Sequence, residues 1–529
     1  MKPLGNLKIA LVLVLNFTIA IVYYIDNLNA NYSELSSDIL NIIPVAQKFD
    51  NPDLFQQDLY LNDINNVKYY TPFYVQTLRF FVKFTNHNYV QAINVLGLIC
   101  HLLFGILWFF LLYKFVNNFW VAFLMSVILR GVVWLPGLEI WGISDLWTIM
   151  PRTVYIAVMP IPFLLISKQF LKLLLGGFLV GFTFNFHPIT GLGGVLMFVT
   201  LIALLLFYYK ALREEFSISK LLLLLLAIVL GILPFILTYF GKTSAEVTYD
   251  LNAFNEAFNA RIPEYFKSPW LFLKKWFGFK TLFFIVPLFL YAIIAFKERK
   301  FGKQAKLLLV LAVMLIVIPS ITIPLERLIN DAFSTNLRMS FQLIRMQKVA
   351  IVPSFFALAF VLDYLFSKVK TIQLLPAFFT LYMFLLVFSK SKALAHVPFF
   401  GDDISKSILP QSLSPFGPED RQKLAIDKIA EYIKAHTKPT DVICGSHILR
   451  GATKRSVIFD GKGTSMLIEG NPKHFAEWQE RHKIINNFKT MEDVVNYLRR
   501  FNADYFVTTS IIPQCELMHS EGKLNLYKL

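Results

Sequence analysis

The sequence predicts a mainly α-helical, polytopic membrane protein that ends in a small α/β domain. Three observations support this fold class. The 529 residues are 56% hydrophobic and only 16% charged, whereas charged residues make up about 25% of soluble domains. Apolar runs recur along most of the chain, each near the length of about 20 residues that crosses a bilayer. After residue 390 the composition changes, and short β-type segments alternate with helical ones.

About eleven apolar segments are predicted to cross the membrane. The first, 9–25, follows Lys2 and Lys8. No small-residue cleavage site comes after it, so we expect an uncleaved transmembrane helix with a cytoplasmic N-terminus. The other predicted spans are 92–113, 119–138, 146–166, 171–186, 190–209, 221–240, 281–296, 307–324, 349–366 and 372–388.

The basic residues favour one orientation. With an odd number of spans, nearly all lysines and arginines of the short loops, among them Lys114, Lys210 and Lys303, lie on the cytoplasmic side. The loop 241–280 is predicted to be external although it is basic, and 268–279 has the pattern of an interfacial amphipathic helix. The net charge of +16 is spread between apolar segments and forms no basic stripe, which argues against nucleic-acid binding.

We therefore predict two domains. Residues 1–390 form the transmembrane domain, with a long external first loop at 26–90, and 391–529 form an external α/β domain. In this tail, helices are expected at 421–435, 475–488 and 491–501, and strands at 441–444, 456–460 and 504–509. The tail lacks a Gly-rich phosphate loop, so no nucleotide site is predicted. Cys444 and Cys515 could pair or remain free thiols.

Asp38 is the first candidate for chemistry, because it lies a short distance beyond the first span. A carboxylate there could accept the proton of an acceptor hydroxyl. The alternative is that Asp38 is the N-cap of a helix, since S-S-D precedes an apolar run. Asp53 and Asp58, in N-P-D-L-F-Q-Q-D, could likewise cap short helices or turns.

Three further candidates belong to the predicted outer ends of spans. Arg152 follows Pro151 and either snorkels to the lipid headgroups or binds an anion, for which its forked guanidinium is suited. His187 is either a turn residue before Pro188 or a proton carrier. Arg345 is either an interfacial anchor or part of an anion-binding helix end. No second His or Cys stands at ligand spacing, so no metal site is predicted.

These features together resemble the GT-C superfamily of membrane glycosyltransferases. The organisation carries the resemblance: a first transmembrane helix, a long external loop that opens with an acidic residue, about ten further helices and an external tail. More narrowly, several short strings are similar to a group of bacterial GT-C-like proteins: S-D-I-L-N-I-I-P, N-P-D-L-F-Q-Q-D, M-P-R-T-V-Y-I-A, N-F-H-P-I-T-G-L, K-R-S-V-I-F-D-G-K and A-E-W-Q-E-R.

The resemblance implies roles for particular residues. Asp38 would be the catalytic base, and Arg152 and Arg345 would contact the lipid phosphate. The tail could cover the site or hold the acceptor, although Trp478 could equally be a core residue. The expected substrate-binding set is Asp58, Arg152, His187, Arg345, Arg455, Lys462, Trp478 and Arg481.

This resemblance and the predicted orientation together imply an enzyme of the plasma membrane that works on the outer face with no cofactor. It would transfer a sugar from a polyprenyl-phosphate donor to a glycan, lipid or protein acceptor in the cell envelope, in contact with membrane lipids. The alternative is a non-catalytic transporter or envelope-assembly protein on the same scaffold. Paired halves with broken helices, expected of many transporters, are not evident.

Overall fold

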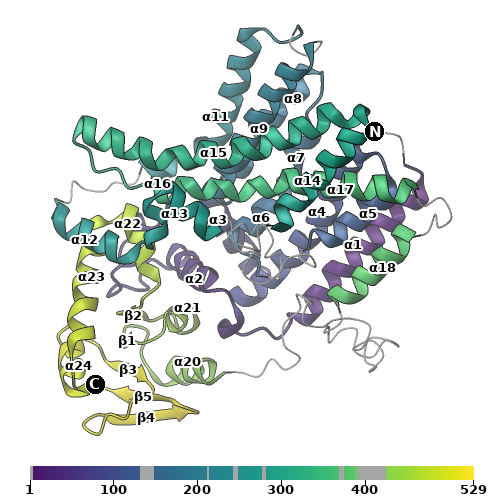
Figure 1. Ribbon diagram of the computed structural model, residues 1–529. Coiled ribbons are helices and arrows are strands. Elements are labelled where there is room, and N and C mark those ends of the chain that lie inside the picture. The colour runs from purple at the N-terminus through teal and green to yellow at the C-terminus, as the bar shows by residue number, and fades with distance from the viewer. Residues whose placement is uncertain are drawn as a thin grey trace. The chain divides into compact units, whose positions relative to one another are not determined.

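The computed structural model describes residues 4–130, 148–210, 214–241, 248–276, 282–368, 375–388, 391 and 424–529. The chain forms two compact units. The first, here called the membrane unit, comprises Met1–Asn27, Asn94–Pro234 and Glu264–Glu419. The second, the loop–tail unit, comprises Leu28–Ile93, Phe235–Pro263 and Asp420–Leu529. Each unit is therefore assembled from segments that are far apart in the sequence (Figure 1).

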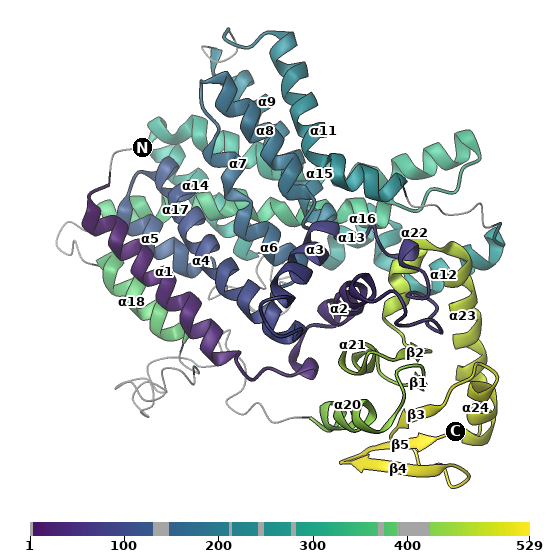
Figure 2. The ribbon, with the colours of Figure 1, turned by 180° about the vertical axis from the view of Figure 1, so that it is seen from behind.

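The described part of the membrane unit is helical (Figure 2). Its elements, two of which run past the bounds of the unit at one end, are α1 (Asn6–Asp26), α4 (Tyr89–Val116), α5 (Phe119–Ile128), α6 (Pro151–Val158), α7 (Pro160–Leu164), α8 (Phe170–Phe184), α9 (Pro188–Tyr208), α11 (Ile218–Phe240), η3 (Glu264–Lys267), α13 (Pro269–Trp276), α14 (Leu282–Lys297), η5 (Arg299–Phe301), α15 (Gly302–Phe333), α16 (Ser340–Leu343), η6 (Ile344–Ala350), α17 (Ile351–Lys368) and α18 (Leu375–Val387).

Six helical segments of the described chain are long and apolar enough to cross a membrane: Asn6–Asp26, Tyr89–Val116, Pro188–Tyr208, Ile218–Phe240, Gly302–Phe333 and Ser340–Lys368. Each of the predicted spans overlaps a helix. The span predicted at 146–166 is split into α6 and α7, where Pro160 cannot donate a backbone hydrogen bond. Residues 131–147, on which parts of two predicted spans fall, lie outside the described residues. The predicted class, a polytopic helical membrane protein, is confirmed.

A fully buried arginine ties three helices of the membrane unit together. Arg130, just after α5, donates to Asn16 Oδ1 of α1 at 2.6 Å and to the His101 carbonyl of α4 at 2.7 Å. Its other terminal nitrogen donates to the Ser126 carbonyl at 2.7 Å. A Cβ atom at Gly105 would come within 2.1 Å of Arg130 Nη2, so only glycine leaves room for the guanidinium. The sequence interpretation did not single out this arginine.

The loop–tail unit contains a five-stranded mixed sheet. Its elements are η1 (Tyr32–Glu34), α2 (Ser37–Asp50), η2 (Ile64–Asn66), α3 (Pro72–Val82), α12 (Leu251–Arg261), α20 (Ala425–His436), β1 (Val442–Cys444), α21 (Ile448–Thr453), β2 (Ser456–Ile458), η8 (Gly463–Met466), α22 (Leu467–Gly470), α23 (Pro472–Asn487), α24 (Met491–Arg499), β3 (Tyr505–Thr508), β4 (Glu516–Glu521) and β5 (Leu524–Lys528).

The strand order is β2-β1-β3-β5-β4, with β1 parallel to β2 and β3 and with β5 antiparallel to β3 and β4. One face of the sheet packs against Ile429 and Ile433 of α20, and the other against Leu498 of α24. Figure 1 shows these two helices on opposite sides of the strands. The three predicted strands overlap β1, β2 and β3. The β4–β5 hairpin was not predicted; its turn begins at Gly522, whose φ of 58° favours glycine.

The first loop packs against the tail rather than standing alone. Helix α2 lies on α21, and Gln47 Nε2 donates to the Gly451 carbonyl at 2.9 Å. The Tyr69 hydroxyl donates to the Met466 carbonyl at 2.7 Å. This grouping differs from the predicted division, which assigned 26–90 to the transmembrane domain. The predicted boundary after residue 390 adjoins 392–423, which lies outside the described residues. Cys444 and Cys515 are free thiols.

Candidate functional site

The Asp38 carboxylate lies in the first turn of α2. Ser36, not Asp38, is the N-cap residue, and its hydroxyl accepts from the Ile39 backbone N–H at 3.4 Å. The Asp38 side chain is 43% exposed, and its Oδ1 atom lies 3.4 Å from Lys462 Nζ of the tail. The structure thus brings together two sequence-predicted residues that are more than four hundred positions apart. An exposed carboxylate beside an ammonium group can accept a proton from, or bind, a polar ligand.

The backbone around Lys462 is held by a buried aspartate. Asp460 Oδ1 accepts from the backbone N–H groups of Lys462 at 2.8 Å and of Gly463 at 2.7 Å. Burial alone would raise the pKa of Asp460, but Arg450 and these two backbone donors hold it below its usual value. The loop that carries Lys462 is therefore anchored by an ionised side chain.

Arg450 connects this aspartate to the first loop. Its Nε donates to Asp58 Oδ2 at 2.5 Å, and its Nη2 pairs with Asp460. The side chains of Arg450 and Asp58 are each only 1% exposed, and the guanidinium lies 4.6 Å from the centre of the Tyr60 ring. Asp58 was predicted to bind substrate. In the structure it is instead the buried counter-ion of Arg450, which leaves it no exposed binding face.

Three other predicted residues of the tail are engaged in the structure of the tail itself. Arg455 donates to the carbonyl oxygens of Thr437 at 2.7 Å and Lys434 at 3.3 Å, at the end of α20. Trp478 is 7% exposed and donates from Nε1 to the Asp460 carbonyl at 2.9 Å. Arg481 pairs with a glutamate one helical turn before it and lies over the Phe501 ring. For Trp478, the core interpretation fits this geometry.

The predicted cationic residues of the membrane unit lie near one another. Arg152 is the second residue of α6, after the N-terminal Pro151. His187 is the N-cap of α9, and its Nδ1 accepts from the Thr190 backbone N–H at 3.1 Å. Burial and the positive charges of Lys348, Arg152 and Arg345 lower the pKa of His187 well below its usual value. Three cations therefore act on a neutral imidazole. We call Arg152, His187, Arg345 and Lys348 the cationic cluster.

The position of η6 brings Arg345 and Lys348 to this cluster. Gln347 Nε2 donates to the Ile316 carbonyl at 2.8 Å and to Ser320 Oγ at 2.7 Å, which fixes η6 against α15. On the α9 side, a Cβ atom at Gly193 would come within 2.7 Å of the Met346 carbonyl. Glycine there permits the close approach of α9 and η6. The sequence interpretation had not included Lys348, three residues after Arg345.

The hydrogen bonding of Arg152 distinguishes it from Arg345 in the cationic cluster. Its Nε atom is buried and has no hydrogen-bond partner among the described residues. Arg345, in contrast, donates to Gln342 Oε1 at 2.8 Å. An unsatisfied guanidinium donor among neighbouring cations is suited to an anionic ligand, because the ligand would supply both the missing acceptor and the missing negative charge.

A second polar group of the loop–tail unit was not predicted. Arg261 of α12 donates from Nη2 to Ser465 Oγ at 3.0 Å. The ring of His482 lies 4.3 Å from that of Trp478. Burial, opposed by Asp460, lowers the pKa of His482, and Arg261 lowers it further. Among the described residues, no group of three or more His, Cys, Asp or Glu side chains could hold a metal ion.

No family model matches the sequence, and no curated protein matches it. Among solved structures, the chain is similar to "Crystal Structure of ArnT from Cupriavidus metallidurans in the apo state". The two chains are 11% identical, 97% of each is covered, and the TM-score is 0.49.

Proposed function

We propose that this chain is a membrane glycosyltransferase of the GT-C type. It transfers a sugar from a polyprenyl-phosphate donor to an acceptor hydroxyl on the outer face of the membrane. The observation that carries the proposal is the cationic cluster at the ends of α6, α9 and η6, within a helical membrane unit. The resemblance of the sequence to the GT-C superfamily, described above, supports the same proposal.

The cluster binds the phosphate of the donor lipid. Arg152 offers its unsatisfied Nε, and Arg345 and Lys348 add two further positive charges. In the reaction the bond between the anomeric carbon and the phosphate oxygen breaks, and the phosphate leaves with the electron pair. Fixed cations stabilise the negative charge that develops on that oxygen in the transition state. A neutral His187 can accept or donate a hydrogen bond without adding to the positive charge.

Asp38 acts as the general base. Its carboxylate takes the proton of the acceptor hydroxyl while the acceptor oxygen forms the new bond to the anomeric carbon. Lys462, 3.4 Å away, orients the carboxylate, and Asp460 holds the loop that presents Lys462. Arg261 and Ser465 contribute polar groups that bind the acceptor.

The phosphate-binding step is tested with polyprenyl phosphate alone. Purified full-length protein is placed in lipid nanodiscs, and its affinity for polyprenyl phosphate is measured for the wild type and for Arg152→Ala. Loss of a charge-assisted hydrogen bond of about 1.5–3 kcal/mol predicts roughly ten- to a hundred-fold weaker binding. Arg299→Ala, which removes an exposed arginine of η5, is the matched control. Equal affinity of Arg152→Ala and wild type would overturn the assignment of the phosphate site.

The transfer step is tested in cells that lack the native gene. Asp38→Asn should leave polyprenyl-phosphate binding unchanged but reduce transfer to surface glycans by about 10²–10⁴-fold, as expected for loss of a general base. Asp53→Asn, an exposed carboxylate of the same loop, should retain transfer. Normal glycans with a folded Asp38→Asn protein would contradict the enzyme proposal. They would favour the non-catalytic transporter or envelope-assembly alternative.

A further inference from the structure

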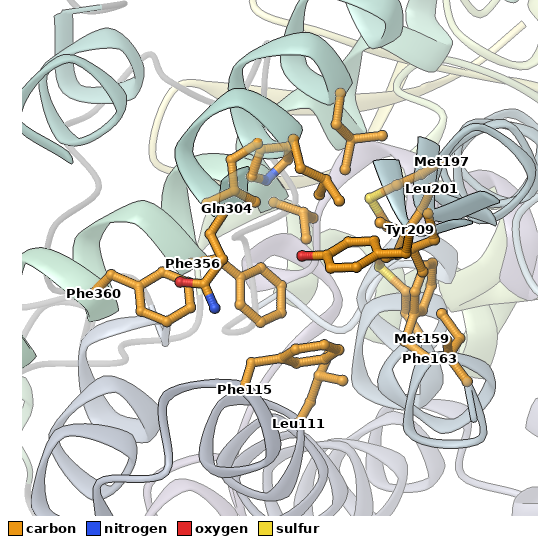
Figure 3. A pocket seen from close by; sticks show the side chains of 17 residues that line it. Leu111, Phe115, Met159, Phe163, Met197, Leu201, Tyr209, Gln304, Phe356 and Phe360 are labelled. Atoms are coloured by element: carbon orange, nitrogen blue, oxygen red, sulfur yellow. The ribbon is translucent and has the colours of Figure 1, made fainter. Parts of the chain in front are cut away.

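The membrane unit contains an apolar cavity that the proposed reaction does not use. Its volume is about 160 Å³, and helices α4, α7, α9, α15 and α17 line it. The walls are aliphatic and aromatic, with Phe115, Phe163 and Phe356 among them. Only Tyr209 and Gln304 bring polar groups to the lining. Figure 3 shows the Tyr209 hydroxyl pointing across the cavity from the side of α9.

The cavity is open at one side of the helical unit. Phe115 in its wall is 41% exposed, and Gln304 is also exposed. The neighbouring outer surface of α15 is apolar, with Leu309 36% and Val313 55% exposed. A helix surface of this kind faces hydrocarbon in a membrane protein. A hydrocarbon chain can therefore enter the cavity directly from the bilayer.

The cavity lies at the opposite end of α9 from the cationic cluster. His187 caps the start of α9, whereas Met197, Leu201, Leu205 and Tyr209 line the cavity. At 1.5 Å per residue these four positions lie about 15–33 Å along the helix from His187. The hydrocarbon core is about 30 Å thick, so the cavity belongs mainly to the other leaflet. A lipid whose phosphate is bound at the cluster has its headgroup in the opposite leaflet. The first carbons of its chain therefore cannot reach this cavity.

Cationic side chains gather at this end of the helices. Lys303 Nζ lies 5.9 Å from the centre of the Tyr209 ring. Lys306 is exposed one turn further along α15, and Lys210 directly follows Tyr209. Lys114 is already engaged, because its Nζ donates to the carbonyl oxygens of Leu164 at 2.8 Å and Ile166 at 2.7 Å. Lys303 and Lys306 are thus placed to meet a negatively charged headgroup.

We propose that the cavity binds a segment of one acyl chain of an anionic phospholipid from the leaflet at this end of α9 and α15, since a cavity of this size holds about as many carbons as a benzene ring. The chain fills the space between Leu201 and Phe356, and the phosphate pairs with Lys303 at the rim. Tyr209 and Gln304 offer hydrogen bonds to the ester region between chain and phosphate. Charge complementarity selects the headgroup, and apolar burial supplies most of the affinity.

The lipid is identified by native mass spectrometry of the full-length protein. The protein is extracted from vesicles that contain phosphatidylcholine and phosphatidylglycerol, and the retained lipids are counted. The wild type should retain about one phosphatidylglycerol per chain. Leu201→Trp on α9 and Leu308→Trp on α15 fill the cavity from two helices of its lining and should each lower retention about tenfold or more, a loss of about 1.4 kcal/mol. Leu309→Trp, which adds the same ring to the outer surface, should retain the lipid.

The rim is tested separately by a surface substitution that leaves the cavity intact. Lys303→Glu should abolish the preference for phosphatidylglycerol over phosphatidylcholine, whereas Lys168→Glu, at a side chain that is 70% exposed and outside the lining, should keep it. Unchanged retention in both tryptophan variants, or an unchanged preference in Lys303→Glu, would overturn the proposal. Retention of a co-purified polyprenyl phosphate instead, lost in Leu201→Trp, would show that the donor lipid occupies the cavity and would overturn the proposal. Failure of the transferase proposal alone would leave the phospholipid result unaffected.

Discussion

The two units each bury an arginine completely, but they neutralise it differently. In the loop–tail unit, Arg450 pairs with the carboxylates of Asp58 and Asp460. In the membrane unit, Arg130 is bound by backbone carbonyls and the Asn16 amide, and its Nε has no hydrogen-bond partner among the described residues. Partial charges of carbonyl groups solvate a guanidinium less strongly than full negative charges. The comparison shows two ways to join chain segments around one cation.

Arg152 stands apart from both. It is only partly buried, its Nε is unsatisfied, and the other charged residues of its cluster, Arg345 and Lys348, are cations. A side chain whose bonding capacity is used inside the fold contributes to stability. A side chain that keeps an unsatisfied hydrogen-bond donor beside like charges contributes little to stability and is available to a ligand. Substitutions at Arg450, around Arg130 and at Arg152 should therefore differ in how much they change stability and in whether they change ligand binding.

The largest effect is expected for Arg450→Ala. It leaves Asp58 and Asp460 buried without their cation, which should cost about 3–5 kcal/mol of unfolding free energy. The measurement is denaturant unfolding of the full-length protein, followed by protease cleavage within the tail. Arg500→Ala, which removes an exposed arginine of the same unit, should leave cleavage unchanged. Wild-type protease resistance in Arg450→Ala would show that the two carboxylates find other partners.

An intermediate effect is expected for Gly105→Ala in the membrane unit. The added Cβ would overlap Asn16 Oδ1 and Arg130 Nη2, so the helices must move apart or the hydrogen bonds must break. Overpacking of this kind costs about 1–3 kcal/mol. Gly302→Ala is the control, since a Cβ there meets no atom within 4 Å. Thermal unfolding in detergent should separate the two variants, and equal midpoints would argue against tight packing around Arg130.

The contrast between these arginines also explains what the sequence could and could not predict. The apolar spans and three tail strands were predicted, because hydrophobic length and periodicity are local properties of the chain. Arg152, His187 and Arg345 were each singled out for being polar beside apolar spans. The pairing of Asp58 with Arg450 was missed, because its two members are 392 positions apart. Nothing near Asp58 indicates which cation the fold will bring to it.

Lys348 and Arg130 show a different reason for failure. Both lie within or beside apolar runs. A single basic residue there is easily interpreted as part of a transmembrane span or of its membrane-surface end. Lys348 is 4% exposed and Arg130 is fully buried, a distinction that depends on which helices pack around them. Arg455 and Trp478 show the converse situation, since polar or aromatic type suggested binding, whereas both donate hydrogen bonds to carbonyl groups within the tail. Residue type predicts capacity for an interaction, and packing decides how that capacity is used.

The smallest effect on stability is expected for Arg152→Ala. Because Nε makes no hydrogen bond to a described residue, its removal breaks none there, and it relieves repulsion with the cations beside His187. The unfolding free energy should change by less than about 0.5 kcal/mol or rise slightly, while polyprenyl-phosphate affinity falls. Thermal unfolding of Arg152→Ala and Gly105→Ala in the same detergent compares the two directly. A loss as large as that of Gly105→Ala would make Arg152 a structural residue, because a side chain reserved for a ligand cannot also hold the unliganded helices together.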